Sequence, residues 1–83
     1  MNWMCYVLQC ADSTLYCGVT NDLDKRLAAH NADEGAKYTR GRTPVKLAYS
    51  ECCADKSTAL KREMEIKGLS RAKKLALVAT SRK

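Results

Sequence analysis

The chain has 83 residues, of which 46% are hydrophobic and 29% are charged, a mixture typical of a globular domain and not of a disordered chain. No apolar run approaches the roughly 20 residues of a membrane span, and the N-terminus lacks the charged-then-apolar pattern of a secretory signal. We therefore expect a single domain over residues 1–83, located in the cytoplasm and without a membrane partner.

Charge is distributed unevenly along the chain, whose formal net charge is +6. Residues 1–55 carry six basic and seven acidic side chains, whereas residues 56–83 carry nine basic and two acidic ones. A basic balance favours a polyanionic partner such as nucleic acid, and the alternative is a solvated surface without a partner.

The five cysteines do not follow the spacing of a zinc site or of a disulfide framework. No CxxC pair is present, His30 is the only histidine, and Cys52 and Cys53 are adjacent. Cys5 and Cys17 lie in apolar runs, where cysteine behaves as a small hydrophobic residue. Free thiols of this kind are typical of a reducing compartment.

Two short apolar runs, at residues 4–8 and 15–19, are separated by a polar turn at 11–14, and this pattern predicts a β-hairpin. Gly18 lies inside the second run. A glycine in a strand indicates either a bulge or the close approach of a ligand or another part of the backbone.

A helix is predicted over residues 23–30, because Leu23 and Leu27 recur at helical spacing. Arg26 and His30 then lie one turn apart, at the edge of the buried face. Three polar residues before the helix are candidates for its N-cap, namely Thr20, Asn21 and Asp22.

Residues 31–44 form a long polar segment, and segments of this length inside a compact domain are often functional. Between Gly35 and Lys46 the chain is basic, contains no acid and includes one aromatic residue, which suits phosphate contacts and base stacking. The alternative is a solvated loop. The candidate nucleic-acid contacts here are Lys37, Tyr38, Arg40, Arg42 and Lys46.

Residues 45–49 predict a third strand, followed by a helix that begins at Asp55 or Ser57 and ends at about Lys67, with Gly68 as its C′ residue. A last helix begins at Ser70. Its predicted apolar face is Ala72, Leu75, Ala76, Val78 and Ala79, and its basic face is Arg71, Lys73 and Lys74. The order ββαβαα predicts an α+β fold, a small antiparallel sheet covered by helices.

Glu63 falls inside the predicted apolar arc of the helix that ends at Lys67, an arc formed by Ala59, Leu60, Met64 and Ile66. A carboxylate on a buried face is costly unless it is paired or binds a cation. One explanation is a structural salt bridge, for example with Arg26. The other is a metal site, since Mg²⁺ takes one or two carboxylates together with phosphate and water.

Taken together, these residues resemble the GIY-YIG nuclease domain over nearly the whole chain. The resemblance is carried by Tyr6, the run Tyr16-Cys17-Gly18, Arg26, His30 and Glu63. The spacing from Tyr16 to Arg26 looks like the YIG-x₇-R region, and residues 59–63 look like the ALxxE helix. Residues 35–42 and 69–74 look more specifically like the small, stand-alone bacterial GIY-YIG group.

The resemblance implies three antiparallel strands flanked by helices, and hydrolysis of a phosphodiester assisted by a single Mg²⁺ or Mn²⁺, with DNA as the usual substrate in preference to RNA. Tyr6 matches the tyrosine of GIY, and Tyr16 and Gly18 match the first and last residues of YIG. Arg26 matches the catalytic arginine and Glu63 the metal-binding glutamate. His30 matches a position often occupied by histidine or tyrosine.

The chain departs from the motifs at three positions. Met4 and Cys5 stand where GIY has glycine and isoleucine, and Cys17 stands where YIG has isoleucine. These departures concern catalysis more than the fold.

The mechanism implied by the resemblance makes Tyr6 the general base or the group that positions water. The usual pKa of a tyrosine is about 10, so a nearby cation such as Arg26 is expected to lower it. Arg26 would also clamp the phosphate, while His30 and Tyr16 orient the water. This mechanism requires Tyr6, Tyr16, Arg26 and Glu63 to converge on one solvent-reachable pocket.

The sequence thus predicts a magnesium-dependent DNA endonuclease, and a structure-selective role in repair or recombination is one expectation. A protein partner is expected to supply specificity to so small a domain. The alternative is a nucleic-acid-binding module with little or no cleavage. A third hypothesis is a protein-interaction module whose basic face meets an acidic partner.

Overall fold

The computed structural model describes residues 2–32 and 39–80, and these contain three strands and three helices. The predicted α+β order ββαβαα is confirmed. The elements are β1 (Trp3–Gln9), β2 (Leu15–Thr20), α1 (Leu23–Asn31), β3 (Lys46–Cys53), α2 (Lys56–Lys67) and α3 (Arg71–Ala79).

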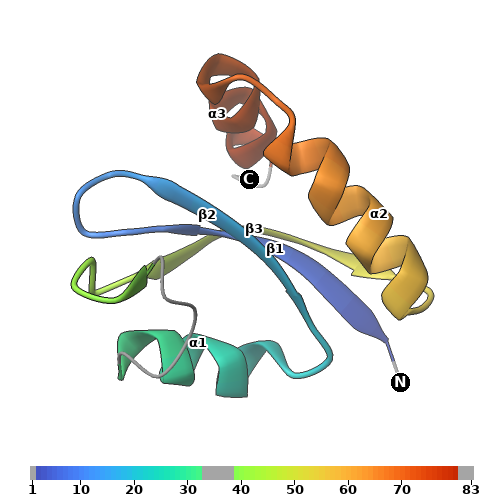
Figure 1. The fold of residues 1–83 in the computed structure, drawn as a ribbon, viewed down its shortest axis with the longest axis horizontal. Helices are drawn as coiled ribbons and strands as arrows, with labels where there is room; N and C mark the ends of the chain where they lie inside the picture. Colours follow the sequence, from blue (N-terminus) through green and yellow to red (C-terminus); the bar gives the residue numbers. More distant parts are fainter. Residues whose placement is uncertain (1, 33–38, 81–83) are drawn as a thin grey trace.

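The strands form one antiparallel sheet in the order β2-β1-β3, so that β1 is central and β2 is an edge strand. Figure 1 shows α1 on one face of the sheet and α2 and α3 on the other. Successive side chains of a strand point to opposite faces. On β1, Cys5 and Val7 therefore join the core beneath α2, whereas Tyr6 and Leu8 join a second core with residues of α1.

Each helix begins at a side chain that accepts a hydrogen bond from the first turn, which offsets the unpaired N–H groups there. Asp22 accepts from the backbone N–H of Lys25, which selects Asp22 from its three candidates. Asp55, and not Ser57, caps α2, and Ser70 caps α3. Gly68 ends α2 with φ −79°, so this helix end does not use the left-handed conformation that favours glycine.

The structure differs from the predicted elements in two places. β3 continues to Cys53, four residues past the predicted end, because it pairs with β1 along its length. The predicted apolar face of α3 is wrong: of its five residues only Val78 is buried, and Leu75 is 45% exposed. The partly buried Leu77 packs against the core instead, so that α3 contributes only a narrow stripe of apolar side chains to the core.

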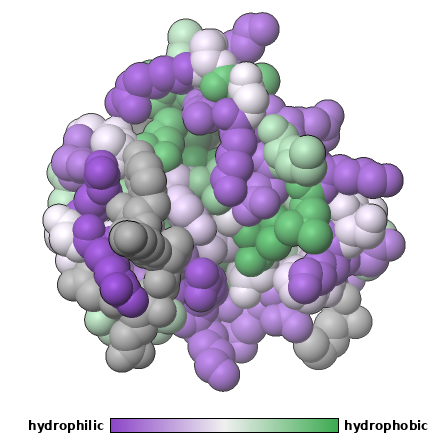
Figure 2. All heavy atoms as spheres, in the orientation of Figure 1, coloured by the Kyte–Doolittle hydropathy of each residue, from purple (hydrophilic) through white to green (hydrophobic). Residues whose placement is uncertain are grey.

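Hydrophilic side chains cover most of the face seen in Figure 2, and apolar side chains show between α2 and the sheet. In the described ranges, no helix has the length and apolar character needed to cross a bilayer.

Candidate active site

Four of the predicted site residues come together on the α1 face of the sheet: Tyr6, Tyr16, Arg26 and His30. The ring centroid of His30 lies 5.3 Å from that of Tyr16 and 6.1 Å from that of Tyr6. The hairpin register supplies the two phenols, and α1 supplies the arginine and histidine one turn apart.

Gly18 makes room for the phenol of Tyr6. The two residues are directly opposite across the β1–β2 ladder, and the Tyr6 ring extends over the glycine. A Cβ at position 18 would lie 2.6 Å from the Tyr6 hydroxyl and 2.8 Å from Cζ. The β1–β2 register is regular at this point, so Gly18 marks a close approach and not a bulge.

A directed chain of hydrogen bonds runs through the cluster. Arg26 Nε donates to the Tyr6 hydroxyl at 3.4 Å, because a guanidinium has no acceptor. The Tyr6 O–H is then free to donate to Nε2 of His30, 3.1 Å away. His30 Nδ1 in turn donates to the hydroxyl of Thr39 at 2.8 Å. With Tyr6 taken as the donor to Nε2, the network is satisfied when the proton of the neutral imidazole lies on Nδ1.

The ionisation of the cluster differs from the expected mechanism. Tyr6 is only 1% exposed, and this burial raises the pKa of its phenol above 10 despite the opposing hydrogen bond from Arg26. Arg26 lowers the pKa of Tyr6 as expected, but the effect of burial is larger, so the net shift is upward. The same hydrogen bond raises the pKa of Arg26. Burial, and next the charge of Arg26, lowers the pKa of His30 below 6.5, which favours the neutral ring.

The single histidine makes this ionisation measurable. The unfolded chain binds a proton at a higher pH than buried His30 does, so the stability contributed by the neutral ring is complete above about pH 6.5. That contribution is lost as the pH falls through the lowered pKa of the folded state. We expect an imidazole NMR titration of the native protein to give a pKa below that of the urea-unfolded chain. An equal or higher value would contradict the burial of His30 and its proximity to the charge of Arg26.

Glu63 does not join this cluster. It lies on α2 between the buried residues Ala59 and Ile66, on the side that packs against β1 and β2. Its side chain is 17% exposed, and Oε2 lies 3.6 Å from Nζ of Lys67, one turn along the helix. The sheet separates Glu63 from the cluster on the α1 face, which differs from the expected convergence on one pocket.

The expected buried arc of α2 around Glu63 is too wide. Leu60 and Met64, expected in the buried arc, are 39% and 72% exposed. The buried stripe is narrower and centred on Ala59 and Ile66, with Glu63 at its border. The expected alternative of a salt bridge between Glu63 and Arg26 is replaced by the pair with Lys67.

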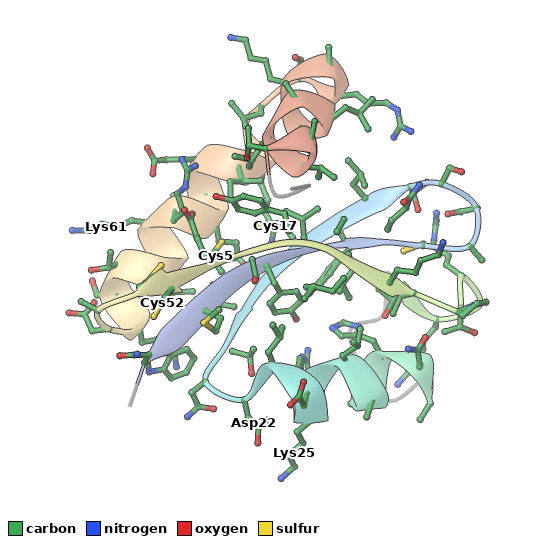
Figure 3. All side chains as sticks on the ribbon, turned by 180° about the vertical axis from the view of Figure 1, so that it is seen from behind. Cys5, Cys17, Asp22, Lys25, Cys52 and Lys61 are labelled. Atoms are coloured by element: carbon green, nitrogen blue, oxygen red, sulfur yellow. The ribbon has the colours of Figure 1, made fainter. Side chains whose placement is uncertain are left out.

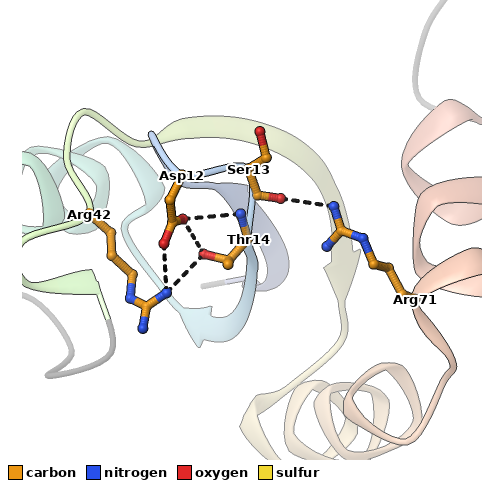
Figure 4. A network of polar contacts seen from close by, with 5 residues as sticks. All are labelled: Asp12, Ser13, Thr14, Arg42 and Arg71. Atoms are coloured by element: carbon orange, nitrogen blue, oxygen red, sulfur yellow. Dashed lines mark hydrogen bonds and ion pairs between the residues drawn. The ribbon is translucent and has the colours of Figure 1, made fainter.

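Two predicted nucleic-acid contacts are engaged with the β1–β2 turn, as Figure 4 shows. Arg42 Nη1 pairs with the carboxylate of Asp12 at 2.8 Å, and Arg71 donates to the backbone carbonyl of Ser13 at 3.1 Å. The turn itself is held by Asp12, which accepts from the backbone N–H and hydroxyl of Thr14. Arg42 and Arg71 therefore stabilise a loop as well as contributing positive charge.

The remaining basic candidates are distributed over the surface. Arg40, Lys46 and Lys73 are exposed, whereas Lys74 is partly buried and lines a cavity beside Cys17. Lys37 and Tyr38 lie outside the described residues.

Two features of the site carry no recognisable sequence signal. Thr39 is fully buried and bonds His30, although it lies in a polar segment with no periodicity. A cavity of about 300 Å³ between the sheet and the C-terminal helices brings Lys67 and Lys74 beside Tyr16 and Cys17. Both features depend on tertiary contacts between distant segments.

Comparison with known proteins places this chain in a family. The GIY-YIG catalytic domain model matches residues 2–76. A UPF0213 protein of Natronomonas pharaonis is 62% identical over 74 residues, which cover 89% of this chain and 87% of that protein. A UPF0213 protein of Desulfotalea psychrophila is 50% identical over 82 residues, covering 98% and 74%. These relatives confirm the expected group of small, stand-alone GIY-YIG proteins, which occurs in archaea as well as in bacteria.

Two solved structures are similar to the whole fold. The solution NMR structure of a UPF0213 protein from Bacillus halodurans has a TM-score of 0.62 at 44% identity, and it covers 96% of this chain and 85% of that one. A solution NMR structure from E. faecalis has a TM-score of 0.65 at 36% identity, with the same coverage. Motifs, fold and relatives agree, and the chain belongs to the GIY-YIG domain family.

Proposed function

We propose that this chain is a divalent-metal-dependent endonuclease that hydrolyses phosphodiester bonds in DNA. The observation that carries the proposal is the hydrogen-bonded chain from Arg26 through Tyr6 to His30, within a domain of the GIY-YIG family. It combines a fixed cation for a phosphate with a route for a proton, which are the two things that phosphodiester hydrolysis needs from side chains.

In this proposal Arg26 binds the phosphate. Its side chain is partly exposed and borders a cavity of about 200 Å³ together with Lys25 and Thr20. The bond from Arg26 to Tyr6 uses the Nε atom of the guanidinium. This bond raises the pKa of Arg26 further, so the side chain keeps its positive charge. A guanidinium pairs well with phosphate oxygens and stabilises charge that develops on them.

Tyr6 and His30 form the proton route. A neutral phenol with a raised pKa is a weak base, but it can accept a proton from water while it passes its own to Nε2 of His30. His30 is available as the acceptor because its lowered pKa keeps the ring neutral at physiological pH. Thr39 fixes the orientation of the ring through Nδ1.

Glu63 is the proposed ligand of the metal. Among residues 2–32 and 39–80, no cluster of three or more His, Cys, Asp or Glu side chains is arranged for a metal. A single carboxylate nevertheless fits Mg²⁺, which completes its shell with water and substrate phosphate, and the ion would displace the ammonium of Lys67 from Glu63. When bound, the ion would supply Lewis acidity to the phosphate. Since α2 with Glu63 and α1 with Arg26 lie on opposite faces of the sheet (Figure 1), the proposal requires the DNA to reach both residues around the edge strand β2.

The exposed cations Arg40, Lys46 and Lys73 are proposed to contact the DNA backbone, which suits binding to DNA shape without base reading. Lys37, Tyr38, Arg42, Arg71 and Lys74 remain proposed contacts of the same kind. Structure-selective cleavage in repair or recombination, a cytoplasmic location and a partner that adds specificity are parts of the same proposal.

The decisive experiment compares Glu63→Ala with the parent on labelled duplex, single-stranded and branched DNA, in Mg²⁺ and in EDTA. We expect Mg²⁺-dependent cleavage by the parent and none by Glu63→Ala, with DNA affinity nearly unchanged. Glu65→Ala is the matched control, because Glu65 is two residues away but its side chain is 68% exposed and faces Arg62. Equal cleavage by both variants would remove Glu63 from the metal site.

A second candidate function is a nucleic-acid-binding module without cleavage. It is favoured by the near-complete burial of Tyr6 and by the position of Glu63 on the other face of the sheet. This candidate predicts DNA binding that weakens with salt. The logarithm of the binding constant should fall against the logarithm of the salt concentration with a slope of about −0.9 for each phosphate neutralised, and no divalent metal ion should support cleavage. A flat salt response would exclude both functions and favour a protein partner.

A further inference from the structure

Two of the motif departures, Cys5 and Cys17, meet in the structure. They come from the neighbouring strands β1 and β2, and their Sγ atoms lie 3.9 Å apart. Figure 3 shows both on the side of the sheet that faces α2. In the register, Cys5 is opposite Val19 and Cys17 is opposite Val7, so the two thiols are diagonal neighbours. All five cysteines of the chain are free thiols in the structure.

The two sulfur atoms are already in contact, at a separation from which a disulfide can form. An S–S bond is about 2.05 Å long, so the two sulfur atoms need to approach by about 1.9 Å in total. The ladder between β1 and β2 holds the two backbones side by side, but diagonal neighbours of an antiparallel pair have Cα atoms roughly 7–8 Å apart. Closing the bond therefore requires the two strands to shift toward each other as well as the side chains to rotate.

The two thiols differ in their access to small molecules. Cys5 is fully buried, whereas Cys17 lines the cavity of about 300 Å³ together with Lys67 and Lys74. The hydrogen bond with Cys5 lowers the pKa of Cys17, and the two lysines act in the same direction, against burial and the charge of Glu63. The same hydrogen bond, and next burial, raises the pKa of Cys5. An oxidant entering the cavity therefore meets Cys17 first.

We propose that Cys17 and Cys5 form a redox-sensitive dithiol, in which a hydroperoxide oxidises Cys17 and Cys5 then closes a disulfide. The thiolate of Cys17 attacks the terminal oxygen of the peroxide, which gives a sulfenic acid and releases hydroxide (an alkoxide from an organic peroxide). The thiol of Cys5 then attacks the sulfenic sulfur, its proton leaves with the hydroxyl group as water, and the S–S bond forms. Two thiols are oxidised and one peroxide is reduced. A transient disulfide of this kind is compatible with a reducing compartment.

The test is a map of the oxidised protein. Reduced parent protein is treated with hydrogen peroxide, its remaining thiols are alkylated, and it is digested with chymotrypsin without reduction. Cleavage after Tyr6, Leu8 and Tyr16 separates Cys5, Cys10 and Cys17, which trypsin leaves on one peptide. We expect the alkylatable thiols to fall from five to three, with the Cys5 and Cys17 peptides joined. A link through Cys10 or Cys53, or five alkylated thiols, would overturn the proposal.

Variants define the order of the two steps. With Cys5→Ala, the Cys17 sulfenic acid has no partner and is expected to be trapped by dimedone, whereas Cys17→Ala gives no trapped product at position 5. Cys10→Ala is the matched control, because Cys10 is also buried but belongs to the core beneath α1. Cys52→Ser removes the exposed thiol that can join two chains. If Cys5→Ala or Cys17→Ala fails to fold, the disulfide map of the oxidised parent protein still decides the proposal.

An effect on the active site rests on the proposed function. Cys5 precedes Tyr6, and Cys17 lies between Tyr16 and Gly18, so a disulfide on one face shifts the phenols on the other. We expect oxidation to slow cleavage about 10-fold or more, reversibly with dithiothreitol, because misplacement by about 1 Å costs up to ~10²-fold. An unchanged rate in a mapped disulfide form would refute this coupling. If the reduced protein cleaves no DNA, the proposed function is refuted, but the disulfide map still tests the redox-sensitive dithiol.

Discussion

Replacing Gly18 by alanine is expected to lower the free energy of unfolding by about 2–3 kcal/mol, at the upper end of the cost of overpacking a core. The added methyl group would lie 2.6 Å from the Tyr6 hydroxyl and 2.8 Å from Cζ, closer than any real contact allows. Tyr6 cannot simply rotate away, because its hydroxyl is held by Arg26 and His30 and its ring is buried.

The same substitution is expected to reduce the rate of DNA cleavage strongly, even where the protein remains folded. Displacing the phenol breaks the hydrogen-bonded chain at its centre, so we expect a loss of about 10²-fold or more in kcat at a temperature where the variant is still folded. Urea unfolding gives the stability, and a cleavage assay on the same preparation gives the rate.

Gly68→Ala is the matched control for Gly18→Ala. At position 68 the backbone has φ −79°, and a Cβ would make only ordinary contacts of 3.5 Å with two carbonyl oxygens. We expect this variant to be as stable as the parent or more stable by about 0.4–1 kcal/mol, since alanine restricts the unfolded chain. If the two variants were equally stable, the close approach at Gly18 would not be a constraint on the fold.

The sequence was sufficient for the fold because local patterns agreed with tertiary structure over most elements. The two apolar runs, the polar turn and the capping residues all specify the observed hairpin and helices. The exception is α3, where a string of alanines and leucines looks like a broad apolar face. The helix is short and lies at the margin of a three-stranded sheet, so only a narrow stripe around Leu77 and Val78 reaches the core.

The candidate site was predictable only in part, because part of it depends on tertiary packing that local patterns do not contain. Arg26 and His30 follow from helical spacing, and Tyr6 opposite Gly18 follows from the hairpin register. The side of the sheet on which Glu63 lies depends on how the helix after β3 packs, and periodicity within one helix does not contain that information. The direction of the pKa shift of Tyr6 likewise depends on burial by other segments, which outweighs the visible cation.

Removing one oxygen from Tyr6 tests the central hydrogen-bonded chain directly. Tyr6→Phe keeps the buried ring but leaves Nε2 of fully buried His30 without its partner, which is expected to cost about 1–3 kcal/mol of stability. If Tyr6 passes a proton from water to His30, cleavage should fall by about 10²–10⁴-fold, the usual contribution of a positioned acid or base. Stability is measured by urea unfolding and the rate by single-turnover cleavage with DNA bound.

Tyr49→Phe is the control that separates these effects. Its hydroxyl also makes a hydrogen bond, to the carboxylate of Glu51 at 3.1 Å, but at the partly exposed surface of β3. We expect a loss below about 1 kcal/mol and an unchanged cleavage rate, because water replaces this partner. A Tyr6→Phe protein that is destabilised but cleaves within about threefold of the parent would leave the phenol a structural role, since even weak acid–base catalysis contributes about 10²-fold. Arg26 would then act on the phosphate without a proton route through Tyr6 and His30.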